Sequence, residues 1–292
     1  MNDDALGEQH LLETGNGRMC FYVRGERSDL PDLVLEHGNG GNAIHWAHLA
    51  PLLSAHGRIF SYDRAGSGGS TPDGLGYGAT AVTQRLSHLV EQAGVRKPFV
   101  LAGYSLGSLY ARHYAASHPQ DVLRLVLVDP TPATWEIRAD QLRRTRRVLW
   151  ALHWAARAGL VSAWWKVTGK KVTPGFRRDL QEFSAPGALT RLLEQLGSSS
   201  AVRAEVARIA PHLRHPALVL TAGLRPGMPA ADSARLREMH HELVAHAPPG
   251  SRLVEIADAD HGSILKDAAA VGQCAKQILD FLRGSLALLA RA

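Results

Sequence analysis

The sequence predicts an α/β fold built around a mostly parallel β-sheet. Short apolar runs alternate with segments of helical periodicity from residue 9 to residue 129, and this alternation resumes after Pro216. The stretch in between, residues 131–212, contains no strand-like run. In addition, a glycine-flanked serine, Ser105, stands between an apolar run and a helical run. Together these observations are typical of a parallel sheet covered by helices, with a helical segment inserted into it.

The amino-terminal part of the chain is expected to supply most of the strands. The pair Asn16-Gly17 lies between two strand-like runs and predicts a tight hairpin turn. The predicted strands are residues 9–13, 19–24, 33–36, 58–62, 99–102 and 123–128. The predicted helices are residues 43–54, 82–93 and a segment running from just after Ser105 to His118, before Pro119.

The carboxyl-terminal part is expected to complete the sheet. The predicted strands are residues 217–221 and 252–256, and the predicted helices are residues 233–247 and 266–282. Because the helical stretch interrupts the alternation, we predict an α/β core of residues 1–130 and 213–292 and an all-helical insertion of residues 131–212.

Composition narrows the function classes. The formal net charge of +6 is concentrated in the insertion and the rest of the chain is slightly acidic, which argues against a nucleic-acid-binding surface over the whole protein. An acidic start without an apolar run argues against a secretory signal, and no run is long enough to span a membrane. The two cysteines, Cys20 and Cys274, lie far apart and fit a reducing compartment, so we expect a cytoplasmic protein.

The stretch Gly103-Tyr104-Ser105-Leu106-Gly107 joins a buried-type strand to a helix. So sharp a turn brings backbone segments close together, so the residues two before and two after the serine must be very small. The start of the following helix directs free N–H groups toward negative charge that develops nearby. We therefore predict that Ser105 is a nucleophile. Ser67 and Ser70, in a glycine-rich loop that starts no helix, are interpreted as turn residues.

A serine nucleophile needs a base, and His261 is the best placed of the 15 histidines. It follows the last predicted strand, in a loop expected at the same edge of the sheet as Ser105. Others, such as His113 and His118, fall in predicted helices. We predict that His261 takes the serine proton and later returns it to the leaving group.

Five stretches of the chain resemble motifs of the α/β-hydrolase-fold superfamily, in the order that this family has them. They are LEHGNGG (35–41), YDRAGSGGS (62–70), GYSLG (103–107), LVLVDP (125–130) and ADHG (259–262). The resemblance covers roughly residues 9–284 and implies an α/β-hydrolase fold with a helical cap. It implies Ser105 as nucleophile and His261 as base. It also implies that the backbone N–H groups of Asn39 and Leu106 form the oxyanion hole.

At the acid that orients His261, the chain departs from the commonest pattern of the family. Relatives usually carry it shortly after the glycine that ends the penultimate strand, but Gly223 is followed by Leu224-Arg225-Pro226-Gly227. Asp129, at the end of the strand after the nucleophile helix, occupies a position that some relatives use. Asp232 is the alternative, although its sequence context also fits a helix N-cap. We favour Asp129.

The insertion is expected to cap the active site and to shape an apolar pocket. Five of the six tryptophans fall in it: Trp135, Trp150, Trp154, Trp164 and Trp165. We expect at least one to contact substrate, and the arginines at 143, 144, 146 and 147 to form a solvated face. Gly38, Tyr104 and Trp135 are the expected substrate contacts.

We therefore predict a serine hydrolase that cleaves a carboxylic ester, lactone or thioester of a small apolar or acyl substrate, without metal or organic cofactor and without a nucleic-acid partner or stable membrane insertion. The sequence leaves the oligomeric state open. An aspartate nucleophile, which a dehalogenase or epoxide hydrolase would need, is absent at position 105. An acyltransferase, lyase or cyclase on the same scaffold, and a non-catalytic binding protein, remain alternatives.

Overall fold

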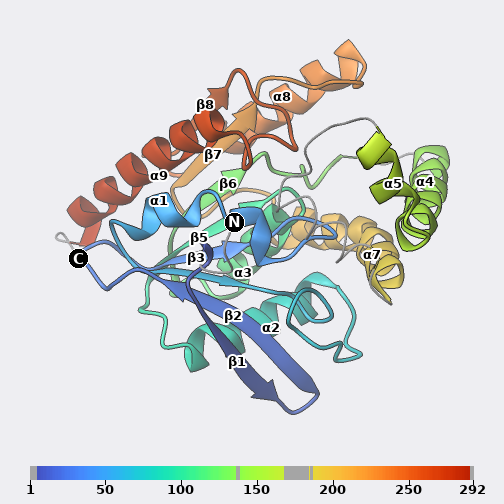
Figure 1. Cartoon of the computed structure of the whole chain (residues 1–292). Coiled ribbons are helices and arrows are strands. Elements are labelled where there is room, and N and C mark those ends of the chain that lie inside the picture. Colours follow the sequence, from blue (N-terminus) through green and yellow to red (C-terminus); the bar gives the residue numbers. More distant parts are fainter. Residues whose placement is uncertain (1–4, 136–138, 168–183, 185–186, 290–292) are drawn as a thin grey trace.

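A computed structural model describes the chain apart from residues 1–4, 136–138, 168–183, 185–186 and 290–292 (Figure 1). Its centre is an eight-stranded sheet with the strand order β1-β2-β4-β3-β5-β6-β7-β8. The first two pairings are antiparallel and all others are parallel. The strands are β1 (Glu8–Thr14), β2 (Gly17–Arg24), β3 (Leu33–Glu36), β4 (Ile59–Tyr62), β5 (Phe99–Tyr104), β6 (Val122–Val128), β7 (Ala217–Ala222) and β8 (Arg252–Ile256). The predicted α/β class and mostly parallel sheet are confirmed.

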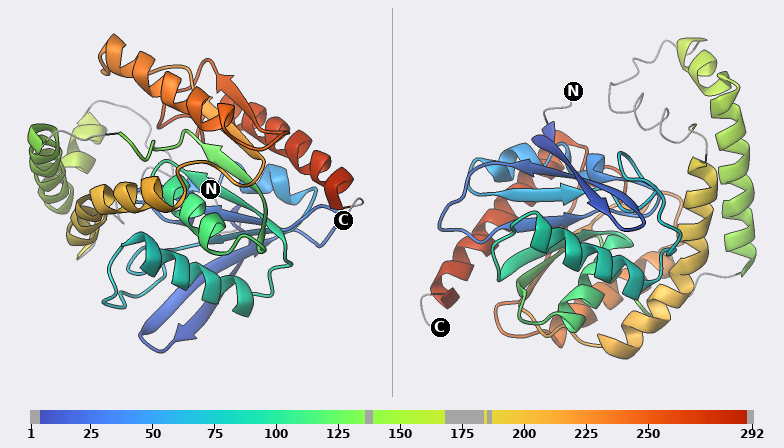
Figure 2. Two further views of the ribbon diagram at one scale, coloured as in Figure 1. Left: turned by 180° about the vertical axis from the view of Figure 1, so that it is seen from behind. Right: turned by 90° about the horizontal axis from the view of Figure 1, so that it is seen from below.

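Helices cover both faces of this sheet (Figures 1 and 2). On one face lie α1 (Ala50–Ser54) and α9 (Ala268–Leu289), and on the other lie α2 (Ala79–Gln92), α3 (Gly107–Ser117) and α8 (Ala230–Ala245). Successive side chains of a strand point to opposite faces of the sheet, so each strand contributes to both cores. Leu33 and Leu35 of β3 belong to the core under α1 and α9, whereas Val34 belongs to the core under α2 and α3.

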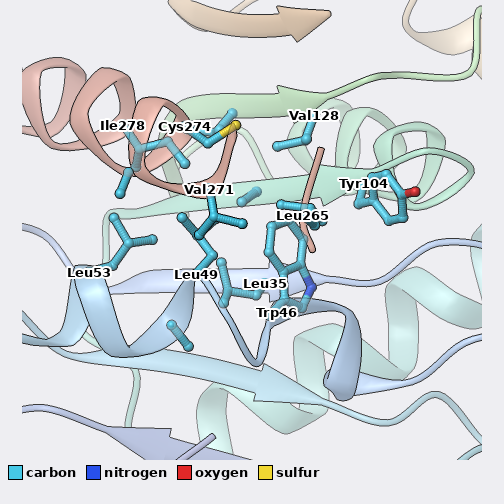
Figure 3. Packing of buried hydrophobic residues seen from close by; sticks show 14 of the residues in the cluster. Leu35, Trp46, Leu49, Leu53, Tyr104, Val128, Leu265, Val271, Cys274 and Ile278 are labelled. Atoms are coloured by element: carbon cyan, nitrogen blue, oxygen red, sulfur yellow. The ribbon is translucent and has the colours of Figure 1, made fainter. Parts of the chain in front are cut away.

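The core under α1 and α9 reaches the edge of the sheet where the strands end (Figure 3). Trp46 and Leu49 pack there with Val271 and Cys274, and all four side chains are buried. Tyr104, the last residue of β5, closes this cluster at the sheet edge. Ser105, which follows Tyr104, is therefore positioned next to a packed core.

Several helix boundaries differ from the sequence prediction; α2, for example, begins at Ala79 and not at residue 82. The segment predicted as one helix over 43–54 is a short 3₁₀ helix, η2 (Ala43–Trp46), followed by α1, because Pro51 starts a new first turn. The helix predicted over 233–247 begins earlier, at Ala230 after Pro229. The last helix continues to Leu289, beyond the predicted end at residue 282.

The described part of the insertion contains three helices, α4 (Ala139–Arg157), α5 (Leu160–Val167) and α7 (Ala188–Ile209), and no strand. Helix α7 packs against α2 and α3, and α4 packs against α5 and α7 (Figure 2). The four arginines of α4 expected at the surface are exposed, and so are Trp150, Trp154 and Trp164. The division into two domains stays a prediction.

No helix within the described residues is both long and apolar enough to cross a membrane. Cys20 and Cys274 are free thiols, and both are buried.

Candidate active site

The site lies where β3, β5, β6 and β7 end, because parallel strands bring their carboxyl ends to one edge. Register places these ends side by side: Glu36 of β3 pairs with Gly103 of β5, and Tyr104 pairs with Val128 of β6. The residues that follow each strand therefore meet at this edge.

Ser105 occupies a strained turn between β5 and α3. Its φ of 53° lies in the left-handed region, which is unfavourable for a residue with a side chain. Its N–H donates to the Val128 oxygen (3.0 Å), and its carbonyl accepts from the N–H groups of Ser108 (3.1 Å) and Thr131 (3.2 Å). A Cβ at Gly103 would lie 2.7 Å from the Gly107 oxygen, so the turn tolerates no side chain there.

Asp129 follows β6 and also has a positive φ, of 40°. It is 3% exposed, and both oxygens of its carboxylate accept hydrogen bonds. Oδ1 accepts a bond from the Ala222 N–H (3.0 Å), and Oδ2 accepts one from Nδ1 of His261 (2.6 Å). The guanidinium of Arg225 binds both oxygens at 2.6 Å. Burial alone would raise the pKa of Asp129, but the hydrogen bonds and charges of His261 and Arg225 hold this pKa well below its ordinary value.

His261 lies in the loop after β8 and is positioned from two sides. Because a carboxylate only accepts hydrogen bonds, its Nδ1 carries the proton shared with Asp129, and Nε2 is left to accept. The ring stacks on Tyr104 with centroids 5.1 Å apart, and the Tyr104 hydroxyl donates to the His261 carbonyl. The side chain remains 52% exposed. A partly open histidine of defined tautomer is suited to proton transfer.

Ser105, Asp129 and His261 line one cavity of about 520 Å³. Apolar side chains form much of its wall, namely those of Pro130, Pro132, Trp135, Leu224, Pro226, Met228 and Leu236. The charged residues on its wall other than Asp129 are Arg203, Arg225 and Asp260. Trp135 lines this cavity, and its contact with substrate stays a prediction. Gly38 and Tyr104 are absent from the lining among the described residues, since Tyr104 packs beneath His261 and Gly38 lies against Ser105 and Tyr104.

The loop after β3 carries Gly38 and Asn39, the expected oxyanion segment. A Cβ added to Gly38 would come within 3.3 Å of the Ser105 Cβ, so this loop lies directly beside the nucleophile. The amide oxygen of Asn39 is buried and has no hydrogen-bond partner among the described residues. Leu106 immediately precedes α3, as its N-cap. Neither Asn39 nor Leu106 is among the described residues that line the cavity, so an oxyanion hole formed by their backbone N–H groups stays a prediction.

Arg64 holds the loop after β3 in place. Its guanidinium pairs with the buried Glu36 and donates to the His37 and Gly38 carbonyls, both at 2.6 Å. Gln195 of α7 accepts from the Gly40 N–H (3.0 Å) and so ties the insertion to the same loop. The YDRAG stretch carries Arg64, but its partners could not be predicted from sequence because they lie far away along the chain.

His45 stabilises the same loop, because its Nδ1 accepts a hydrogen bond from the Gly38 N–H (3.3 Å). Burial, together with the charges of Lys266, Arg64 and His261, lowers the pKa of His45 to about 3. This histidine is therefore neutral at ordinary pH and acts as an acceptor.

The alternatives considered from sequence lie elsewhere. Asp232 is exposed in the first turn of α8 and is not the N-cap, which is Pro229. Ser70 is buried, accepts from the Cys20 N–H and donates to the Asp63 carbonyl, as expected for a turn residue. No group of three or more His, Cys, Asp or Glu side chains within the described residues is arranged to hold a metal ion.

Comparison with known proteins gives a consistent result. A model of the alpha/beta hydrolase family matches residues 33–273. A monoacylglycerol lipase (abhd6-B) of Xenopus laevis is 28% identical over 145 residues, which are 49% of this chain and 43% of that protein. A pimeloyl-[acyl-carrier protein] methyl ester esterase of Edwardsiella ictaluri is 40% identical over 120 residues, 38% of this chain and 43% of that one. The chain thus matches less than half the length of these curated relatives.

Solved structures match over a longer part of the chain. A hydrolase from Pseudomonas aeruginosa has a TM-score of 0.68 at 24% identity and covers 94% of this chain and 98% of its own. The epoxide hydrolase CorEH has a TM-score of 0.70 at 16% identity, with 95% and 99% covered. At such identities the likeness shows the fold alone.

Proposed function

Because the chain belongs to the alpha/beta hydrolase family, we propose that it is a serine hydrolase that cleaves a carboxylic ester, lactone or thioester through an acyl-enzyme intermediate. The observation that carries this proposal is the 2.6 Å bond between His261 Nδ1 and Asp129 Oδ2, in the cavity that Ser105 also lines. The names of the matched relatives, a lipase and a methyl ester esterase, support ester hydrolysis in general.

In the proposed mechanism, the Ser105 hydroxyl attacks the substrate carbonyl as Nε2 of His261 takes its proton. Asp129 keeps the imidazole in the required tautomer and stabilises the imidazolium that forms. The backbone N–H groups of Asn39 and Leu106 bind the oxygen of the tetrahedral intermediate. His261 then gives its proton to the leaving group. Water, deprotonated by the same histidine, releases the acid and regenerates Ser105.

Ser105 also favours this proposal over a dehalogenase-type or epoxide-opening reaction. Those reactions attack a carbon atom with a carboxylate and pass through an alkyl ester. A serine hydroxyl at position 105 is suited to acyl chemistry instead. The rival acyl transfer reaction shares the first half of the mechanism, and it is distinguished by whether water alone serves as acceptor.

We propose further that the insertion caps the cavity. Trp135, at its start, and Arg203, on α7, both line the cavity that contains Ser105. The apolar wall is suited to an acyl chain or a ring.

A fluorophosphonate probe tests the nucleophile directly. We expect one covalent adduct, at Ser105, and we expect no adduct in a Ser105→Ala variant. Ser67→Ala, in the rival glycine-rich loop, is the matched control and should be labelled like the wild type. Peptide mass spectrometry locates the adduct, and an adduct at any other serine, or none, would refute the assignment. Hydrolysis of 4-nitrophenyl esters with water as sole acceptor then separates a hydrolase from an acyltransferase.

A further inference from the structure

Arg203 differs from the other buried arginines of the described chain. It is 5% exposed, and its only hydrogen-bond partner among the described residues is the Ser200 hydroxyl (3.1 Å), one turn earlier on α7. The others have carboxylate or carbonyl partners: Arg64 with Glu36, Arg85 with Asp73, Arg112 with the Ala210 carbonyl and Arg124 with the Phe281 and Gly284 carbonyls. No carboxylate of the described residues forms an ion pair with Arg203.

The carboxylates of the cavity already have partners. Asp129 is bound by His261 and Arg225. Asp260 accepts from the Gly262 and Ser263 N–H groups, at 2.8 and 2.9 Å. Arg203 lines the same cavity, and among the described residues its side chain donates a single hydrogen bond although a guanidinium has five donors.

A buried cation without a counter-charge is unfavourable. Burial lowers the pKa of the Arg203 guanidinium, but arginine stays protonated, so its charge would stabilise an anion bound beside it. Helix α7 holds this residue in place, because Val202 and Val206 pack with Leu109 and Tyr110 of α3. The charge is therefore presented to the cavity from a fixed element.

We infer that Arg203 binds a carboxylate of the substrate, so that the enzyme prefers esters whose acyl chain ends in a carboxylate. This inference rests on the hydrolysis proposed for Ser105. A guanidinium and a carboxylate form two parallel hydrogen bonds, which gives one arginine both affinity and orientation. The apolar wall, with Trp135, Leu224 and Leu236, suits the methylene chain between the carboxylate and the ester. Arg203 is thereby a specificity-determining residue.

Matched ester pairs test this preference. The substrates are the mono-4-nitrophenyl esters of hexanedioic, octanedioic and decanedioic acids, each compared with the same ester whose far carboxylate is capped by methyl. We expect wild-type kcat/KM to be ~10-fold or more higher for the anionic partner at one of these lengths or more. Arg203→Gln should bring the ratio of the two close to one, and Arg203→Lys should keep part of it.

Arg208→Gln is the control, since Arg208 is an exposed arginine on the same helix, and it should keep the wild-type ratio. The inference is overturned if the wild type shows no preference at any of the three lengths. It is also overturned if Arg203→Gln lowers both esters of a pair equally, because a packing role alone would do that. The unfolding midpoint of each variant shows whether it is folded.

A binding measurement separates this inference from the proposed reaction. Titration calorimetry with the Ser105→Ala variant compares monomethyl octanedioate with dimethyl octanedioate. Tighter binding of the monomethyl ester, lost when Arg203→Gln is added, supports the carboxylate site even if neither ester is hydrolysed by the wild type. Equal binding of the two esters, with hydrolysis of the neutral substrates intact, rejects the Arg203 site and leaves the proposed reaction standing.

Discussion

Arg225 stands in the segment after β7 where relatives in this family usually carry the acid. The chain places a cation there instead, and this cation pairs with a carboxylate at the end of β6. The guanidinium binds both oxygens of Asp129 while His261 shares one of them, so the carboxylate cannot rotate without breaking a charged contact. The arginine after β7 therefore binds and fixes the acid, which this chain carries after β6.

This arrangement predicts which aspartate orients the base. Asp129→Asn would offer an amide where His261 needs an acceptor, and it favours the wrong tautomer of the ring. We expect kcat for an activated ester to fall at least ~100-fold. Asp232→Asn changes an exposed carboxylate of α8 and should leave kcat within about threefold of wild type. Steady-state kinetics of the two variants decide the point, and a larger loss in Asp232→Asn would move the role to that residue.

Much of the proposed site could be predicted from local sequence, because its main groups sit in turns with strict requirements. The glycines around Ser105 and the position of His261 after the last strand are visible without coordinates. Arg203 and Arg225 carry no such local signal. Arg203 matters because no described carboxylate pairs with it, and Arg225 matters because it binds Asp129. Both facts depend on tertiary packing.

Arg64 shows how the strand ends are tied together. Its side chain, which follows β4, pairs with Glu36 at the end of β3 and holds two carbonyls of the loop beside Ser105. Burial raises the pKa of Glu36, although Arg64 and Tyr62 act against this rise. Through Gln195, α7 joins the same group, so the insertion and the oxyanion loop share one polar network.

Removal of Arg64 should therefore lower the stability of the fold. Arg64→Met leaves Glu36 buried without its counter-charge, and we expect the free energy of unfolding to fall by about 3–5 kcal/mol. Adding Glu36→Gln should recover part of this loss, because the orphaned charge is then gone. Urea denaturation of Arg64→Met and of the double variant measures the loss and its recovery. A single variant as stable as the wild type would show that the pair contributes little.

The helix boundaries show where prediction from sequence fails. The strands were predicted almost as they are found, since their apolar runs are short and bounded by turn residues. The segment 43–54 has no strong periodicity, and Pro51 divides it into η2 and α1. At the start of α8, the run Ala230-Ala231 extends the helix before Asp232, and the sequence context of Asp232 alone suggested a later start. Both boundaries depend on local residues whose effect the hydrophobic periodicity does not show.

The stability of the whole molecule should depend on pH through His45, a partly buried histidine. In the folded chain the pKa of His45 is lowered from 6.5 to about 3, because burial and neighbouring cations disfavour its charged form. Between these two values the unfolded chain binds a proton that the folded chain does not. The free energy of unfolding therefore rises with pH across this window, and acidification below about pH 6.5 destabilises the fold.

Replacement of His45 by asparagine isolates this contribution. Asparagine keeps an acceptor for the Gly38 N–H but does not titrate, so the wild type should lose stability relative to His45→Asn as pH falls. We expect the difference in unfolding free energy to change by about 1 kcal/mol per pH unit between about pH 6 and about pH 4.5. Urea denaturation at several pH values measures it, and other titrating groups, such as His37, cancel because both proteins contain them. Parallel stability curves for the two proteins would mean that the pKa of His45 is the same in the folded and the unfolded chain. The role assigned to His45, as a neutral hydrogen-bond acceptor beside the oxyanion loop, would then be wrong.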